Sequence, residues 1–160
     1  MYWYAKQHEV WNTSMDLALD ENAHHSRIYA VADLGSVIEK IVARMRVLAY
    51  SDRDLFSIRL AVTEAVINGF RHGNCGDPSK FVQISFLVTP RETLVDVQDQ
   101  GNGFDPACVP DPLVDENLDR PGGRGIFLMR VYTSWMCFNQ QGNRVSLCRR
   151  RSGPPEARAR

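Results

Sequence analysis

The sequence predicts an α+β fold, and three observations carry this prediction. Apolar residues between positions 34 and 45 recur at the spacing of one helical stripe. Residues 60–70 are apolar on nearly every side of a helix, which is typical of a buried helix. In residues 81–89 apolar side chains alternate with others, as a strand with one buried face requires. A chain of 160 residues is large enough for one such domain and too short for two.

The amino-terminal part of the chain has the least regular pattern. Residues 1–26 are taken as an extension to which the sequence assigns no role. Residues 15–19 alternate between apolar and other side chains and are a candidate strand. Residues 27–31 are a second candidate strand.

Two helices are expected next. Asp33 opens the first helix, and its expected apolar stripe consists of Leu34, Val37, Ile38, Ile41, Val42 and Met45. Ser51 or Asp52 caps the second helix, because short polar side chains accept hydrogen bonds from the free N–H groups of a helix start. Gly73 and Asn74 end the second helix.

The second half of the chain is expected to contain most of the strands. The elements are, in order, strands at 81–89 and 93–99, a loop at 101–121, a helix at 123–133, and a hairpin of strands at 135–140 and 144–149. The loop is rich in glycine, proline and acidic residues and is long for a compact domain. Loops of this length are usually functional or mobile.

Charge and cysteine content argue against several classes of protein. Nineteen basic side chains balance nineteen acidic ones, so no overall field favours direct contact with nucleic acid or a membrane. Residues 151–160 are expected to be a basic disordered tail. The four cysteines include no C-x-x-C pair, which favours free thiols in a reducing compartment over a zinc site. We expect a cytoplasmic protein, because no apolar run reaches the ~18 residues of a membrane span and the start lacks an apolar signal core.

The second expected helix carries three polar residues that could form a site. Glu64 and Asn68 are four residues apart and share one helical face, and His72 lies one further turn along. A buried carboxylate or amide without a partner costs on the order of 1–3 kcal/mol. A ligand or a cation would supply the missing partners. The alternative is structural: Glu64 caps a neighbouring loop and Asn68 bonds to backbone.

A second candidate lies in the segment VDVQDQGNGFDP. Asp99 ends a strand on the same side as Val95 and Val97, immediately before Gly101 and Gly103. A carboxylate on a covered face must accept hydrogen bonds, and the exocyclic amine of a base would supply one. Glycines permit the close approach that a ligand beside backbone demands. The alternative is an ordinary turn, in which Asp and Gly are favoured residues.

A third candidate is the segment PGGRGIFLMR. Gly122, Gly123 and Gly125 lie where a loop becomes a helix. A helix start offers free N–H groups and the positive end of its dipole, which favour a phosphate group. Arg124 or Arg120 would add a formal positive charge. The alternative is a flexible loop end that happens to be rich in glycine.

The order and spacing of these three segments resemble the GHKL ATP-binding fold. That fold is shared by histidine kinases, type II topoisomerases, heat-shock chaperones and mismatch-repair ATPases. Within it, LAVTEAVINGFRHGN and GGRGIFLMR are most similar to segments of the bacterial anti-sigma factor serine kinases. The resemblance covers residues 27–150 and implies a two-layer sandwich, in which helices cover one face of a mixed β-sheet.

The resemblance implies a role for each residue at the nucleotide. Asn68 would ligate Mg²⁺ through its amide oxygen, a donor that this cation prefers. Asp99 would accept from the adenine amino group, and Gly101 and Gly103 would shape the base pocket. His72 would complete the ATP-binding set in the first segment.

The same resemblance implies how the phosphates are held and transferred. Gly123, Arg124 and Gly125 would enclose the phosphates, with Arg120 as the alternative to Arg124. Glu64 would be the general base that takes the proton from a serine hydroxyl. Phosphoryl transfer depends mainly on positioning and charge neutralisation, so one base, one cation and one anion site are sufficient.

Two residues depart from the family pattern. Gln100 stands where the family often has Asn after the Asp. Asn143 follows Gly142 where the family tends to have Thr near the adenine. Both remain polar, so we expect nucleotide binding to be kept and the geometry around the adenine to differ.

Two functional hypotheses follow. The first is a Mg-ATP-dependent serine-protein kinase that phosphorylates an anti-anti-sigma protein of the STAS type, with a sigma factor and a second copy of the chain as further partners. The second is a binding module in which the nucleotide decides which partner is held, without phosphoryl transfer. Glu64 favours the enzyme, because nucleotide binding alone requires no base at that position.

Overall fold

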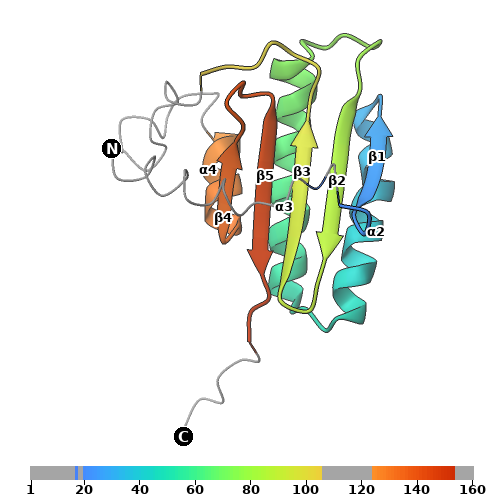
Figure 1. Ribbon diagram of the computed structural model, residues 1–160, viewed down its shortest axis with the longest axis vertical. Coiled ribbons are helices and arrows are strands. Elements are labelled where there is room, and N and C mark those ends of the chain that lie inside the picture. Colours follow the sequence, from blue (N-terminus) through green and yellow to red (C-terminus); the bar gives the residue numbers. More distant parts are fainter. Residues whose placement is uncertain (1–16, 18–19, 106–123, 154–160) are drawn as a thin grey trace, which may run out of the picture.

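The computed structural model describes residue 17, residues 20–105 and residues 124–153. Figure 1 shows one β-sheet with the helices packed against a single face of it. The sheet has five strands in the order β1-β2-β3-β5-β4. The strands are β1 (His24–Ile28), β2 (Val82–Val88), β3 (Glu92–Gln98), β4 (Trp135–Phe138) and β5 (Arg144–Arg150). The helices are α2 (Leu34–Val47), α3 (Asp52–Asn68) and α4 (Arg124–Tyr132), with a 3₁₀ turn η1 (Val31–Asp33) and a π-helical turn η2 (Gly69–Gly73).

This arrangement confirms the predicted α+β class and the placement of helices on one face of the sheet. The expected mixture of parallel and antiparallel pairs does not occur: all four strand pairs in the described part of the chain are antiparallel. Hairpin connections explain two of these pairs, because β2 leads directly into β3 and β4 leads directly into β5. β5 then lies beside β3, which joins the two hairpins into one sheet.

The apolar stripe predicted for the first helix is confirmed. All six stripe residues of α2 are buried, and Ile41, Val42 and Met45 have no exposed surface. They pack in one core with α3 and with the inner face of the sheet. Fully burying a side chain of this size stabilises the fold by about 1.5–3 kcal/mol.

The second predicted helix begins as expected and ends in an unexpected conformation. Ser51 is its N-cap, and its side chain accepts a hydrogen bond from the Asp54 N–H group. The α-helical part stops at Asn68, and the chain continues as the π turn η2. The Asn74 N–H group then donates to the Gly69 carbonyl over 2.7 Å. Such π turns are rare and occur frequently at functional sites.

The first strand lies earlier than predicted. β1 begins at His24 and ends at Ile28, where residues 27–31 had been expected. Its exposed histidines hide it from a search for apolar alternation. The candidate strand at residues 15–19 lies outside the described residues except for Leu17, which is buried in a turn.

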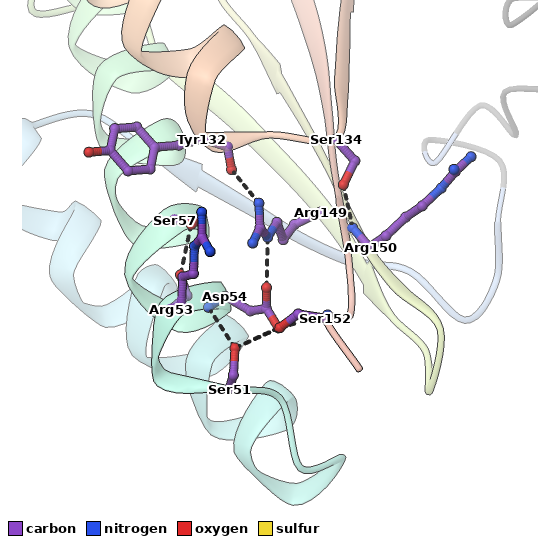
Figure 2. A network of polar contacts seen from close by, with 9 residues as sticks. All are labelled: Ser51, Arg53, Asp54, Ser57, Tyr132, Ser134, Arg149, Arg150 and Ser152. Carbon is purple, nitrogen blue, oxygen red and sulfur yellow. Dashed lines mark hydrogen bonds and ion pairs between the residues drawn. The ribbon is translucent and has the colours of Figure 1, made fainter. Parts of the chain in front are cut away.

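The carboxyl-terminal end of the described chain is fastened to the start of α3 (Figure 2). Asp54 has no exposed surface, and its Oδ1 atom accepts from the Nε atom of Arg149 over 2.8 Å. Its Oδ2 atom accepts from the Ser152 N–H group over 3.0 Å and from the Ser152 hydroxyl over 2.6 Å. The Ser51 hydroxyl donates to the same oxygen over 2.9 Å. Ser152 is therefore held by the domain, although residues 151–160 had been expected to form a disordered tail.

Within the described residues, no helix combines the length and apolar character needed to cross a membrane.

Candidate functional site

A cavity of about 370 Å³ lies between α3 with its π turn, α4, and the neighbouring ends of β3 and β5. Its apolar lining consists of Ala65, Val97, Ile126, Met129, Phe138 and Val145. Its polar lining includes Asn68, His72, Asp99 and Asn143. The volume falls in the usual range for a small-molecule site, and a mostly apolar wall with few polar groups is typical of such sites.

The side chains of Glu64 and Asn68 meet the first turn of α4. A Cβ atom added to Gly125 would lie 3.0 Å from the Glu64 Oε2 atom and 3.1 Å from the Asn68 Nδ2 atom. Both side chains are half-buried. In the described part of the chain neither side chain has a hydrogen-bond or ion-pair partner. The described residues therefore give no support to the structural alternative, in which Glu64 caps a loop and Asn68 bonds to backbone. Gly125, which is distant in sequence from Glu64 and Asn68, is thus their neighbour in space.

Asp99 lines the same cavity as Asn68. Its Oδ1 atom accepts from the Gly101 N–H group over 2.7 Å, and its own N–H group donates to the Asn143 carbonyl over 3.0 Å. Burial raises the pKa of the Asp99 carboxyl above its ordinary value, although the Gly101 hydrogen bond acts in the opposite direction. Asp99 is half-buried and lines the cavity, and no hydrogen bond to its Oδ2 atom is found among the described residues. Such a carboxylate is suited to accept a hydrogen bond from a ligand.

The glycines around Asp99 permit close contacts between segments. A Cβ atom on Gly73 would overlap the Asp99 carboxyl group, and one on Gly101 would overlap the Gly73 carbonyl. Gly103 lines the cavity and has a φ of +74°, a conformation that glycine adopts without strain. The Asp-x-Gly-x-Gly segment therefore forms a turn and a cavity wall at once, so the two interpretations of it are compatible.

His72 lies at the rim of the cavity. It is exposed and belongs to the π turn, beyond the last α-helical residue, Asn68. The helical spacing of Glu64, Asn68 and His72 predicted one common face. The π turn changes the local spacing, yet His72 still borders the same cavity as Asn68.

The third predicted segment is described only in part. α4 begins at Arg124, and its Gly125 faces Glu64 and Asn68. The side chain of Arg124, and all of Gly123 and Arg120, lie outside the described residues. The choice between Arg124 and Arg120 as the phosphate contact therefore stays a prediction.

Several residues at or beside the cavity were not among the predicted site residues. Phe104 and Phe138 line the cavity and form an edge-to-face pair, with ring centroids 5.0 Å apart. Asn143, noted only as a departure from the family pattern, also lines the cavity, and its side-chain oxygen accepts from Asn139 over 2.7 Å. Asn74, assigned only to ending a helix, is completely buried, and its side-chain oxygen accepts from the N–H group of Gln100, the residue after Asp99. Its position directly after His72 and Gly73 was the available signal.

Comparison with known proteins agrees with this geometry. Residues 26–149 match the model of the histidine kinase-like ATPase domain family. The chain belongs to this family. The serine/threonine-protein kinase BtrW of Bordetella bronchiseptica is 27% identical over 106 residues, which cover 65% of this chain and 72% of that protein. The histidine kinase-like ATPase family accounts for the α+β architecture, and an ATPase domain implies that the chain binds ATP.

The donor set of this ATPase domain fits a magnesium ion shared with a nucleotide. No group of three or more His, Cys, Asp or Glu side chains that could hold a metal occurs among the described residues. Asn68 lines the cavity, and its amide oxygen has no hydrogen-bond partner among the residues that the structure describes. Mg²⁺ is usually bound by one or two protein oxygens together with substrate phosphates and water. One protein ligand is therefore sufficient here.

Proposed function

We propose that this histidine kinase-like ATPase domain is a serine-protein kinase that phosphorylates an anti-anti-sigma partner of the STAS type with Mg-ATP. The observation that carries the proposal is the position of Glu64. Its carboxylate lies beside Asn68 and Gly125, where the triphosphate would end, and not in the apolar part of the cavity. A site that only held a nucleotide would gain nothing from an unpaired carboxylate close to the phosphates, because like charges repel.

The adenine would occupy the apolar part of the cavity. Asp99 would accept from the amino group of the base, and Gly73 and Gly101 allow that carboxylate to lie against the backbone. Gly103 and Phe104 would cover the base from the side of the loop. This part of the site selects the nucleotide and fixes its direction.

The triphosphate would extend from there toward Asn68 and the start of α4. The amide oxygen of Asn68 would hold Mg²⁺, which neutralises charge that develops on the phosphates. The free N–H groups at the start of α4 would donate to phosphate oxygens. Gly123, Gly125 and either Arg124 or Arg120 would complete this enclosure, and His72 would border it from the rim.

Glu64 would then act on the incoming serine. Its carboxylate takes the proton of the hydroxyl group while the serine oxygen forms a bond to the γ-phosphorus and the bond to the β–γ bridging oxygen breaks. The products are a phosphoserine on the partner and ADP. A base placed in this way typically contributes 10²- to 10⁴-fold to the rate.

The partner is inferred from the resemblance of LAVTEAVINGFRHGN and GGRGIFLMR to anti-sigma factor kinases. The kinase name of the Bordetella relative supports phosphoryl transfer to a hydroxyl group. We propose a sigma factor and a second copy of this chain as further partners, and the cytoplasm as the compartment.

The proposal is tested by incubating the purified chain with γ-labelled ATP, Mg²⁺ and candidate anti-anti-sigma domains. Wild type should label a serine of one domain, and Glu64→Gln should lower that rate at least about a hundredfold while ATP affinity stays within about threefold. Asn68→Ala should weaken Mg-ATP binding. Glu39→Gln is the matched control, because Glu39 lies on α2 in an exposed ion pair with Arg59 of α3. This variant should change neither the rate of serine labelling nor the affinity for Mg-ATP.

Two results would contradict the proposal. If Glu64→Gln reduced binding and transfer to the same degree, Glu64 would be a structural residue. If ATP controlled partner binding without labelling any serine, the chain would be a nucleotide-gated binding module, the second hypothesis.

A further inference from the structure

Behind the cavity, a closed ring of three hydrogen bonds joins Asn74, Phe81 and Gln100. The Asn74 side-chain amide donates to the Phe81 carbonyl over 3.0 Å. The Phe81 N–H group donates to the Gln100 side-chain oxygen over 2.8 Å. The Gln100 N–H group donates to the Asn74 side-chain oxygen over 2.9 Å. The ring ties together the end of the π turn, the residue before β2 and the segment after β3.

The ring is placed so that it restricts the backbone next to Asp99. Gln100 directly follows Asp99, so the hydrogen bond to its N–H group fixes the peptide that leaves Asp99. On the other side of Asp99, its own N–H group is fixed by the Asn143 carbonyl. The carboxylate has little freedom left: one oxygen accepts from Gly101, and the group lies against Gly73. The ring therefore limits how the Asp99 carboxylate can move relative to the cavity that it lines.

Asn74 is the member of the ring that the fold protects most. It has no exposed surface, and its N–H group donates to Gly69 across the π turn. Both hydrogen-bonding atoms of its side chain are used within the ring. A buried amide that is satisfied in this way holds its neighbours in a defined geometry, because breaking either bond leaves a buried polar group unpaired.

Gln100 explains why the ring closes. Its side-chain oxygen accepts from the Phe81 N–H group over 2.8 Å while its own N–H group donates to Asn74, so this one residue supplies two of the three bonds. The residue noted as a departure from the family pattern thus has a structural partner outside the cavity.

We infer that Asn74 and Gln100 are positioning residues that set the selectivity of Asp99 for a nucleotide base with an exocyclic amine. This inference rests on the proposed function, in which Asp99 accepts from the adenine amino group. A carboxylate held rigidly distinguishes an amine from a hydrogen atom or a carbonyl oxygen, whereas one free to rotate toward water loses much of that discrimination. Asn74 itself touches no part of the nucleotide.

The test compares ATP with purine riboside triphosphate, which carries hydrogen in place of the amino group, by equilibrium titration calorimetry. Wild type should prefer ATP by at least about tenfold, the value expected for one hydrogen bond to a charged group. Asn74→Ala should lose most of that preference and keep its affinity for the analogue. Gln100→Ala should lose less, in the same direction. Tyr50→Phe, which removes a hydrogen bond to Thr89 at the far end of the hairpin, is the matched control and should keep the preference.

A double-mutant cycle separates positioning from general damage. In the Asp99→Ala background, Asn74→Ala should not reduce ATP affinity further, because the group it positions is gone. Additive losses, or an equal loss for both nucleotides in Asn74→Ala, would overturn the inference. If Asn74→Ala does not fold, Gln100→Ala decides, and an unchanged preference in that variant would overturn it.

The outcomes also separate this inference from the proposed function. A wild-type chain that binds neither nucleotide would overturn both. A wild-type chain that prefers ATP, with the preference kept in the Asn74 and Gln100 variants, would overturn the inference and leave the proposed function intact.

Discussion

Replacing Asp54 should destabilise this domain more than replacing any exposed carboxylate. The Asp54 side chain is fully buried, and the Arg149 side chain that it pairs with is 16% exposed. Removing the carboxylate would leave the guanidinium charge largely desolvated and would release Ser51 and Ser152 (Figure 2). Breaking one partner of a buried ion pair typically costs about 3–5 kcal/mol. We expect Asp54→Ala to lower the free energy of unfolding by that amount.

The measurement is urea denaturation followed by far-ultraviolet circular dichroism, with Glu39→Ala at an exposed ion pair as the control. The control should change stability by less than about 1 kcal/mol. A second arm replaces both partners, Asp54→Leu with Arg149→Met, which should recover much of the loss because no unpaired charge remains. A loss below about 1 kcal/mol for Asp54→Ala, or a double variant as unstable as the sum of its parts, would refute the reasoning.

The same cluster makes stability depend on pH in a defined direction. Burial by itself would raise the pKa of the Asp54 carboxyl, but hydrogen bonds from Ser152, Arg149 and Ser51 together hold it below its ordinary value. The unfolded chain therefore binds the proton more readily than the folded one. The contribution is complete above the ordinary carboxyl pKa of about 3.9 and is lost as the pH falls through the lower folded value. Asp54→Asn should lack this acid-dependent loss.

Two further predictions concern the cavity. Burial raises the pKa of Asp99, so protonation of this carboxyl should weaken ATP binding at a higher pH than protonation of an ordinary Asp would. ATP titrations across acidic pH should show this loss of affinity in wild type and not in Asp99→Asn. Identical pH profiles for the two proteins would contradict the prediction. Gly125→Ala would place a Cβ atom 3.0 Å from the Glu64 Oε2 atom, so Mg-ATP affinity should fall roughly tenfold. The free energy of unfolding, measured in urea, should stay the same or rise by up to about 1 kcal/mol. A variant with unchanged affinity would show that Gly125 is not part of the site.

The elements that depend on local patterns could be predicted from the sequence, and those that depend on distant contacts could not. The stripe of α2 and the Ser51 cap follow from residues three or four apart, which interact within one helix. The π turn leaves no signal of this kind, because the apolar pattern continues through Gly69 and Phe70. The attachment of Ser152 to Asp54 joins residues 98 positions apart. This attachment can be seen only in the folded structure, where β5 lies beside the start of α3.

The candidate site divides in the same way. Glu64 and Asn68 share a face because of helix geometry alone, and Asp99 ends a strand because of alternation alone. Asn68 and Asp99 line one cavity, and Glu64 lies beside Asn68 at the first turn of α4. This arrangement depends on α4 packing beside α3, which no local pattern specifies. Asn74 shows the limit most clearly. Because it follows His72 and Gly73, the sequence suggests only that Asn74 ends a helix. Its complete burial and its two side-chain hydrogen bonds are seen only in the structure.

The helix α3 and its π turn connect the two ends of the proposed nucleotide site. Asn68, at the last α-helical position, faces the start of α4, and Gly73, at the last position of the π turn, faces the Asp99 carboxylate. One continuous backbone therefore sets the distance between the group that would hold the metal and the group that would read the base. An α-helical turn in place of the π turn would displace Gly73 along the helix, and any side chain there would overlap Asp99. The rare backbone conformation and the glycine together let the helix that carries the proposed metal ligand, Asn68, approach the strand end that carries Asp99, the proposed base-reading carboxylate.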